Sequence, residues 1–295
     1  MEKIKIITDS CSDISTEIAE RLGIRILPIS FTFDGETYFK EGIDMNKDEF
    51  YERLSSEKDS VPKTAQVPPI QFADAYNEEY NNGYNVLIVV TISSMGSGMY
   101  QNAVMSANEV MEERGGEIVV IDSMSYSCLY GAAVIHAAKM LNNGKLKDEI
   151  VSYLKDATQS MKAYFVVDDL LHLKKGGRIN AATLVIANML DIKPVLAIKD
   201  GLVVQNSKLR GSKKLMKKLV GQAEDDGFDL SGRSVFVVNT DCKEKMEELK
   251  EEISIKFPGV KMNELKLGAV IGCHGGPALC GFVFSDKYDF DDYEG

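Results

Sequence analysis

The run Asn85–Ile92 constrains the fold most, because it is almost continuously apolar and lies between two segments whose apolar residues recur at helical spacing. A strand without polar alternation is covered on both faces, which is typical of the central strands of a parallel sheet. Further short apolar strands are predicted at 3–8 and 117–121, each followed by a helix-like segment. This strand-then-helix rhythm predicts an α/β unit with a doubly wound, mostly parallel sheet.

Before the apolar run, the pattern predicts less regular structure. A single strand is predicted over Arg25–Phe33, ended by the turn signal Asp34–Gly35. Residues 46–60 are predicted to form a polar helix. Prolines on both sides of residues 63–66 should keep that segment extended.

The pattern changes after about residue 160. Two apolar strands flank Asp200–Gly201, which is a strong signal for a two-residue hairpin turn. Helices are predicted around 215–220 and 244–253, and hairpins mixed with helices favour an α+β unit. We therefore expect two domains, an α/β domain at 1–160 and an α+β domain at 161–295.

The composition argues against several classes of protein. The formal net charge is -11, whereas a general nucleic-acid binder needs surplus Lys and Arg to neutralise phosphates. No apolar run approaches the roughly 20 residues that span a bilayer. The five cysteines are scattered, without the spacing of a zinc site. We expect a cytoplasmic protein with reduced thiols, and no metal, cofactor or transmembrane segment.

Polar residues follow three of the predicted strands, at Asp9–Ser10, Ser93–Ser94 and Asp122–Ser123. In a doubly wound sheet these loops meet in one crevice beyond the carboxyl ends of the strands. Ser93, Ser94 and Ser97 also precede a predicted helix, where hydroxyls and free N–H groups suit a carboxylate or phosphate oxygen. Alternatively, Ser97 only caps its helix. Thr64 is an ordinary surface residue unless its rigid loop directs the hydroxyl at a ligand.

A basic turn with two adjacent glycines lies in the second half of the chain, at His172–Asn180. Lys174, Lys175 and Arg178 surround the glycine pair. Because glycine lets backbone N–H groups approach a ligand closely, this segment is a candidate anion-binding turn. The alternative is a solvated turn with incidental lysines.

Two further residues stand out by their neighbours. His274 lies beside several glycines, which suggests that backbone must come close to something there, although many such histidines are structural. Arg210 precedes Gly211 and a lysine-rich helix. Of this second basic run, Arg210 is the residue that we expect to have a specific role, whereas most of the lysines lie on the wet face of a helix.

Together these motifs resemble those of the DegV-like family, two-domain bacterial proteins that bind a fatty acid. The Leu173–Ile179 segment is fairly specific, and the other motifs match in order across nearly the whole chain. They are Ile7–Ser10, Thr64 ahead of Pro68, Ile92–Ser94, Ser97–Gly98, Lys193–Pro194, Lys199–Gly201, Arg210 and Gly272–His274.

The resemblance implies a lipid carrier without turnover of its own. The acyl chain of a long-chain fatty acid would lie in a tunnel between the two domains. The threonine and one of two loop serines would hold its carboxylate, with the arginine and the histidine nearby. The ligand-binding residues that follow are Thr64, Ser93, Ser94, Ser97, Arg178 and His274.

The resemblance also implies a partner protein, although the chain differs from the family pattern at a few positions. A separate fatty acid kinase would convert the bound acid into an acyl phosphate, and Arg210 matches a position that meets this kinase. The chain departs from the family pattern at Ala65–Pro68, Met95–Gly96, Met99 and Gly275–Ala278. These changes bear on how the head group is held and on which acyl chain fits.

Two other functions remain open on the residues alone. Ser94 or Ser97, Asp122 and His274 occur in the chain order of an α/β-hydrolase triad, so a serine hydrolase acting on a lipid or ester is the main alternative. The chain lacks the G-x-S-x-G elbow of that fold. A phosphate- or nucleotide-binding protein is a third possibility, but the chain contains neither a P-loop nor a G-x-G-x-x-G motif after a strand.

Overall fold

The computed structural model describes residues 2–57, 61–168, 170–179, 192–211 and 214–290. A four-stranded sheet, with the strand order β2-β1-β6-β7, organises the N-terminal part. All of its neighbouring strands are parallel. The strands are β1 (Ile4–Asp9), β2 (Arg25–Leu27), β6 (Val86–Thr91) and β7 (Glu117–Asp122). The apolar run forms β6, where every residue is buried, which confirms the prediction of a central strand.

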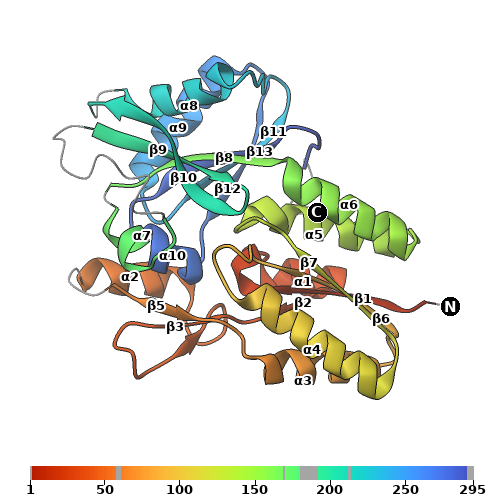
Figure 1. Ribbon diagram of the computed structural model, residues 1–295. Helices are drawn as coiled ribbons and strands as arrows, with labels where there is room; N and C mark the ends of the chain where they lie inside the picture. The colour runs from red at the N-terminus through yellow and green to blue at the C-terminus, as the bar shows by residue number, and fades with distance from the viewer. Residues whose placement is uncertain (1, 58–60, 169, 180–191, 212–213, 291–295) are drawn as a thin grey trace.

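Helices cover both faces of this sheet (Figure 1). One face carries α1 (Thr16–Leu22) and α5 (Cys128–Asn142), with α6 (Lys147–Ser160) packed on α5. The other carries α3 (Pro69–Asn81) and α4 (Met99–Arg114), which pack on each other. The predicted doubly wound arrangement is therefore confirmed.

The single strand predicted over Arg25–Phe33 is wrong. The chain divides at Pro28, where β2 ends and β3 (Ser30–Thr32) begins in another sheet. Proline has no N–H to donate, so it cannot continue a strand ladder and marks such a break. The second sheet is antiparallel, with the order β4-β3-β5, and includes β4 (Phe39–Lys40) and β5 (Lys63–Ala65).

The helix predicted at 46–60 is α2 (Lys47–Ser56). The Asn46 side chain accepts a hydrogen bond from the Glu49 backbone, and the Glu49 carboxylate accepts one from Asn46, so a capping box fixes its start. Residues 58–60 lie outside the described residues. The short 3-10 helix Ser10–Ser12 follows β1 directly.

A six-stranded mixed sheet organises the C-terminal part, in the order β10-β9-β8-β13-β11-β12. Its strands are β8 (Met161–Val166), β9 (Ile192–Lys199), β10 (Leu202–Arg210), β11 (Ser234–Asn239), β12 (Lys261–Lys266) and β13 (Cys280–Ser285). Only β11 and β12 pair in parallel. All six strands follow residue 160, which supports a division there, and the two domain ranges stay a prediction.

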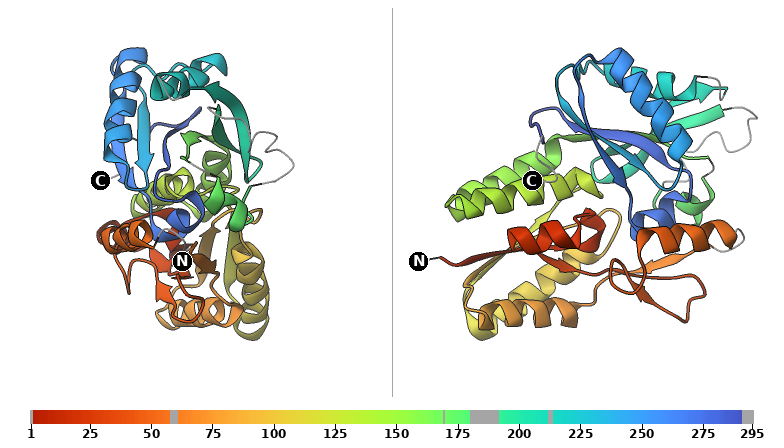
Figure 2. Two further views of the ribbon diagram at one scale, coloured as in Figure 1. Left: turned by 90° about the vertical axis from the view of Figure 1, so that its left-hand side faces the viewer. Right: turned by 180° about the vertical axis from the view of Figure 1, so that it is seen from behind.

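The two faces of the six-stranded sheet differ in what covers them. Helices α8 (Leu215–Asp225) and α9 (Lys243–Lys256) pack together on the outer face (Figure 2). The inner face turns toward α5, α7 (Leu171–Lys175) and α10 (Ala269–Gly275). Asp200 and Gly201 both have positive φ, 50° and 73°, so the predicted hairpin turn is confirmed.

Helix α10 joins the two parts of the molecule. It follows β12 in the chain but packs against α2, β3 and β5 of the N-terminal part. Phe31, Phe50 and Tyr51 form a small aromatic core there, into which Ala269 and Cys273 of α10 insert. A segment from late in the sequence is thereby fixed beside β5, which carries Thr64.

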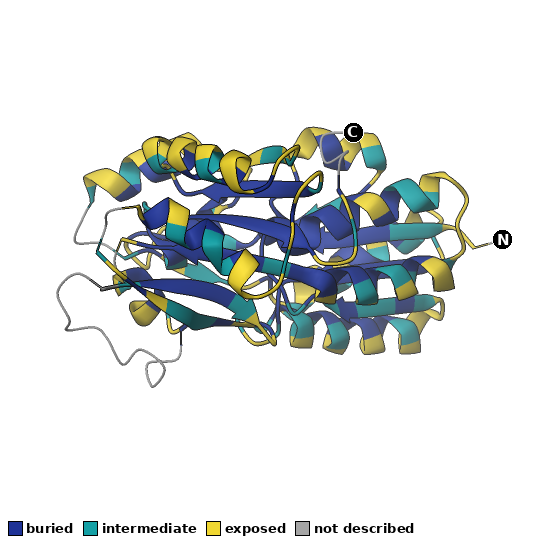
Figure 3. Cartoon of the chain, turned by 90° about the horizontal axis from the view of Figure 1, so that it is seen from above, coloured by how far each residue is buried: buried dark blue, intermediate teal, exposed yellow. Residues whose placement is uncertain are grey.

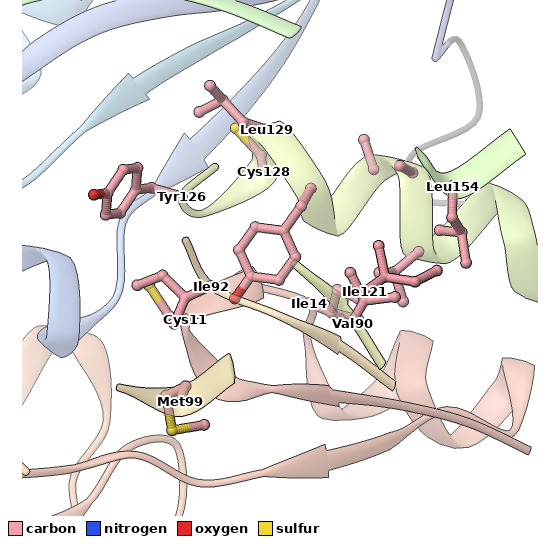
Figure 4. Close-up of a cluster of buried hydrophobic side chains, with 14 of the residues drawn as sticks. Cys11, Ile14, Val90, Ile92, Met99, Ile121, Tyr126, Cys128, Leu129 and Leu154 are labelled. Atoms are coloured by element: carbon pink, nitrogen blue, oxygen red, sulfur yellow. The ribbon is translucent and has the colours of Figure 1, made fainter. Parts of the chain in front are cut away.

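Burial follows these layers. In Figure 3 the strands are largely buried and the outward sides of the helices are exposed. Figure 4 shows side chains of the larger core, among them Tyr126, Cys128 and Leu129 near the start of α5 and the strand residues Val90 and Ile121. No helix in the described part of the chain has the length and apolarity needed to cross a membrane.

Candidate functional site

A cavity of about 390 Å³ lies between the N-terminal loops and the inner face of the six-stranded sheet. The strands supply much of its apolar wall, including Ala163, Phe165, Val203, Val238, Phe282 and Val283. The polar side chains at its lining include Thr64, Gln66, Ser97, Tyr126, Arg178 and His274. A second cavity of about 780 Å³ adjoins it and shares Ala163, Tyr164 and Ile198 with the first. The first cavity therefore suits a guest with a long apolar body and one polar group.

Thr64 and His274 meet at this cavity although 210 residues separate them in sequence. Strand β5 positions the threonine and α10 the histidine, and Thr64 Oγ1 lies 3.0 Å from His274 Nε2. Burial, reinforced by the charge of Arg178, lowers the pKa of His274 to about 4, so the imidazole is neutral at pH 7. If Nε2 carries the ring proton, it donates to Thr64, whose hydroxyl proton can then point to a bound anion.

The glycine-hinged turn owes its first glycine to this histidine. A Cβ on Gly176 would lie 2.3 Å from His274 Nδ1, closer than any real contact, so the position admits only glycine without a shift of the ring. The close approach expected at this pair is thus made by a side chain of the protein at Gly176, whereas nothing lies within 4 Å of the Cβ position of Gly177, which has a φ of 68°. Asn180, the last residue of the predicted turn, lies outside the described residues.

Arg178 is the one cation of that turn that lines the cavity; Lys174 and Lys175 are exposed. Its Nε donates to the Gly96 carbonyl at 3.0 Å, and Nη1 donates to the Gly176 carbonyl at 2.5 Å. These bonds tie the turn to the serine loop and hold the guanidinium half-buried at the cavity wall. A half-buried cation attracts a carboxylate more strongly than a solvated one, because less water screens it.

The three loop serines are placed differently. Ser97 lines the cavity, whereas Ser93 and Ser94 do not. Ser93 is fully buried, and its Oγ donates to the Gly201 carbonyl at 2.8 Å. Tyr126 Oη donates to the same carbonyl at 2.7 Å. Ser93 therefore helps to fasten the β9–β10 turn over the N-terminal loops.

The three polar strand ends meet as predicted, but none of the residues named there, Asp9, Ser10, Ser93, Ser94, Asp122 and Ser123, lines the cavity. Asp9 Oδ2 accepts from the Ile92 N–H at 2.8 Å, and Asp122 Oδ1 accepts from the Ser94 N–H at 3.1 Å. Burial raises the pKa of Asp9 to about 6. These carboxylates hold loop backbone, and His274 bonds to a threonine, so the described contacts assemble no Ser-His-Asp chain.

Arg210 lies apart from the cavity. It is the last residue of β10 and is exposed. Its carbonyl accepts from Lys218 Nζ at 2.7 Å. Among the described residues, no group of three or more His, Cys, Asp or Glu side chains could hold a metal ion.

Glu41 was not among the expected site residues, yet it positions α10. Its Oε1 accepts from the Val270 N–H at 2.8 Å and Oε2 accepts from the Ser10 hydroxyl at 2.6 Å. Nearby, Lys47 Nζ donates to Asp13 at 2.8 Å and to the Lys266 carbonyl at 2.7 Å. No sequence pattern marks this network, because its members come from loops, helices and a strand with no common spacing.

Replacing Glu41 by glutamine is expected to change how stability depends on pH. Burial first, and then the charge of Asp13, raise the pKa of Glu41 from its ordinary 4.5 to about 7 in the folded protein. The protonated carboxyl therefore stabilises the fold below its unfolded pKa, and this contribution is lost as pH rises through 7. Glutamine stays neutral at every pH. The free energy of unfolding of the variant, relative to that of wild type, should therefore be on the order of 2 kcal/mol higher at alkaline than at acid pH.

Urea unfolding at about pH 5 and about pH 8 measures this shift. Glu244→Gln, at an exposed helical position, is the control and should follow wild type at both pH values. A difference between Glu41→Gln and wild type that is the same at both pH values would refute the assignment.

The comparisons with known proteins agree along the whole chain. A family model described as "Uncharacterised protein, DegV family" matches residues 3–287. A DegV domain-containing protein of Caldanaerobacter subterraneus subsp. tengcongensis is 33% identical over 287 residues, which cover 97% of this chain and 100% of the relative.

Solved structures give the same result. A stearic acid-binding protein from Eubacterium ventriosum has a TM-score of 0.82 at 30% identity, covering 95% of this chain and 97% of its own. DegV from Bacillus subtilis, described as a fatty acid binding protein, has a TM-score of 0.82 at 29% identity, covering 96% and 99%. On the full-length match of fold and sequence, the chain belongs to the DegV family.

Proposed function

We propose that this protein binds a long-chain fatty acid, with the acyl chain in the cavity and the carboxylate at its polar residues. The observation that carries the proposal is one cavity that combines an apolar wall from the inner sheet face with Thr64, Arg178 and His274. Relatives of the same fold are described as binding stearic acid or fatty acids, which supports this ligand class.

The carboxylate would be held by Thr64 and Arg178, with His274 orienting the threonine hydroxyl. Ser97 lines the same cavity and can add a hydroxyl. Ser93 and Ser94 would shape the loop behind them, because the Ser93 hydroxyl is engaged with Gly201. A carboxylate removed from water needs such partners, otherwise it protonates or leaves.

Affinity would come from the tail and orientation from the head group. Each buried CH₂ contributes about 0.8 kcal/mol, so a chain of ~16 carbons gives roughly 13 kcal/mol of gross burial. Association costs roughly 4–15 kcal/mol before any net affinity remains. The acyl chain must therefore be almost fully buried for tight binding.

The protein would act as a carrier without turnover of its own, handing the acid to a separate fatty acid kinase that forms the acyl phosphate. This step is implied by the resemblance to the family. Arg210 would contact the kinase, and its exposed position outside the cavity suits a docking residue. A serine hydrolase is the weaker alternative, since His274 bonds to Thr64 instead of a serine.

Native mass spectrometry of the freshly purified protein tests the binding function. We expect one fatty acid per chain, which is lost on delipidation and regained when the acid is added back. In a second arm, ATP and a bacterial fatty acid kinase should form acyl phosphate from the loaded protein faster than from free acid. Protein without stoichiometric lipid that also fails to take up palmitate or stearate would refute the proposal. Stoichiometric labelling of a serine by an active-site phosphonate would favour the hydrolase.

A further inference from the structure

The second cavity, of about 780 Å³, lies next to the first but away from the carboxylate site. The two cavities meet at Ala163, Tyr164 and Ile198, which line both. Strand β8 runs through this junction, because Phe165 lines only the first cavity and Met161 lines only the second. A guest that follows β8 away from the carboxylate site therefore enters the second cavity.

The walls of the two cavities differ in polarity. Beyond its polar end, the first cavity is lined by apolar side chains of the six-stranded sheet, such as Phe165, Val203 and Phe282. The second is lined by many polar and charged residues, which include Ser125, Thr158, Gln159, Lys162, Lys199 and Asp226. Covering polar groups with hydrocarbon is unfavourable, because they lose water without gaining a partner. The second cavity therefore suits a polar group better than a plain hydrocarbon tail.

Two buried hydroxyls at the second cavity can bond to such a group. Ser125 is 2% exposed, and its N–H donates to the Ser123 hydroxyl at 3.1 Å. The Ser125 hydroxyl itself bonds to no other residue in the described part of the chain. Thr158 is 3% exposed and donates to the Leu154 carbonyl at 2.9 Å, so its oxygen can still accept. Since buried hydroxyls normally have partners, Ser125 points to a polar group on a guest.

The charges around the second cavity balance each other. Its lining contains the cations Lys162 and Lys199 and the carboxylates Asp200 and Asp226. Lys162 is already engaged, since its Nζ lies 3.1 Å from Asp286. An anion would meet as much repulsion as attraction there. A neutral polar group, such as a hydroxyl, fits this balance better than a second carboxylate does.

We propose that the ligands of this protein include long-chain fatty acids with a hydroxyl on the last carbon of the acyl chain, the ω-hydroxy acids. The inference rests on the proposed function, because the carboxylate must lie at Thr64 and Arg178. The tail then follows β8 past Ala163, and the terminal hydroxyl reaches Ser125 and Thr158 in the second cavity. A cavity closed by apolar side chains would discriminate against these acids, because the hydroxyl would lose water without a new partner.

Isothermal titration of the full-length, delipidated protein tests the inference. The ligands are palmitate, stearate, their two ω-hydroxy counterparts, and stearate hydroxylated at its middle carbon. We expect at least one ω-hydroxy acid to bind within about threefold of its parent acid, since new hydrogen bonds replace those to water. The mid-chain hydroxyl meets only the apolar wall, so that acid should bind roughly tenfold to a hundredfold more weakly than stearate.

A variant tests the contact that receives the hydroxyl. Ser125→Ala should weaken binding of the ω-hydroxy acid by about threefold to tenfold and leave the parent acid unchanged. Ser12→Ala is the matched control, because Ser12 is also buried, its hydroxyl has no partner among the described residues, and it lines neither cavity. The control should bind every ligand as wild type does. Thermal unfolding establishes that both variants are folded.

The outcomes separate this inference from the proposed function. If palmitate and stearate bind but both ω-hydroxy acids bind about tenfold more weakly or worse, the inference alone is overturned. An equal effect of Ser125→Ala on the ω-hydroxy acid and on its parent would also overturn it. Folded protein that binds none of the acids would refute the proposed function, and the inference with it.

Discussion

Thr64→Val is expected to weaken binding of a long-chain fatty acid by roughly tenfold to a hundredfold, which corresponds to the loss of one hydrogen bond to a charged group. Valine keeps the shape of threonine but removes the hydroxyl that lies 3.0 Å from His274 Nε2. The variant would leave both the carboxylate and the imidazole short of a partner in a half-buried site. A fatty alcohol of the same length carries no charge, so its affinity should fall far less.

Isothermal titration of the delipidated protein with the acid and with the alcohol measures both effects. Thr8→Val is the control, because Thr8 lines neither cavity and its buried hydroxyl donates to the Val90 carbonyl at 2.9 Å. The control should bind both ligands as wild type does. An equal loss for acid and alcohol in Thr64→Val would show that the hydroxyl does not meet the head group.

The elements that could be predicted from the sequence are those whose cause is local. The apolar run gave β6 because burial on both faces leaves no polar alternation, and Asp200–Gly201 gave the hairpin because positive φ favours those residues. The break at Pro28 was missed because Arg25–Phe33 remains apolar on both sides of it. Periodicity alone does not tell one long strand from two short ones in different sheets.

The polar end of the cavity depends on contacts between distant segments, which spacing cannot reveal. Thr64 meets His274 only because α10 packs against β5 and α2. Ser93 looked like an anion ligand by its place after a strand, but the hairpin turn 108 residues away takes its hydroxyl. Glu41 holds α10 from a loop with no motif. In each case the partner, and not the residue itself, decides the role.

Ala163→Leu is expected to reduce affinity for palmitate and stearate by roughly a hundredfold while leaving octanoate nearly unchanged. Ala163 is buried on β8, and it lines both the first cavity and the one adjoining it. Three added carbons would occupy space that the end of a long tail needs. Displacing about four methylenes costs about 3 kcal/mol at ~0.8 kcal/mol each, and this gives the expected factor.

Titration of the delipidated variant with acids of increasing length measures where affinity stops rising, and wild type should continue to gain beyond that length. In a packed core three extra carbons would destabilise the protein. Here the lipid-free variant should unfold at the wild-type temperature or above, because the new side chain fills empty space. Ala73→Leu, half-buried on α3 and remote from the cavity lining, is the control and should follow wild type at every chain length. Equal losses for octanoate and stearate in Ala163→Leu would mean that the tail does not run along β8.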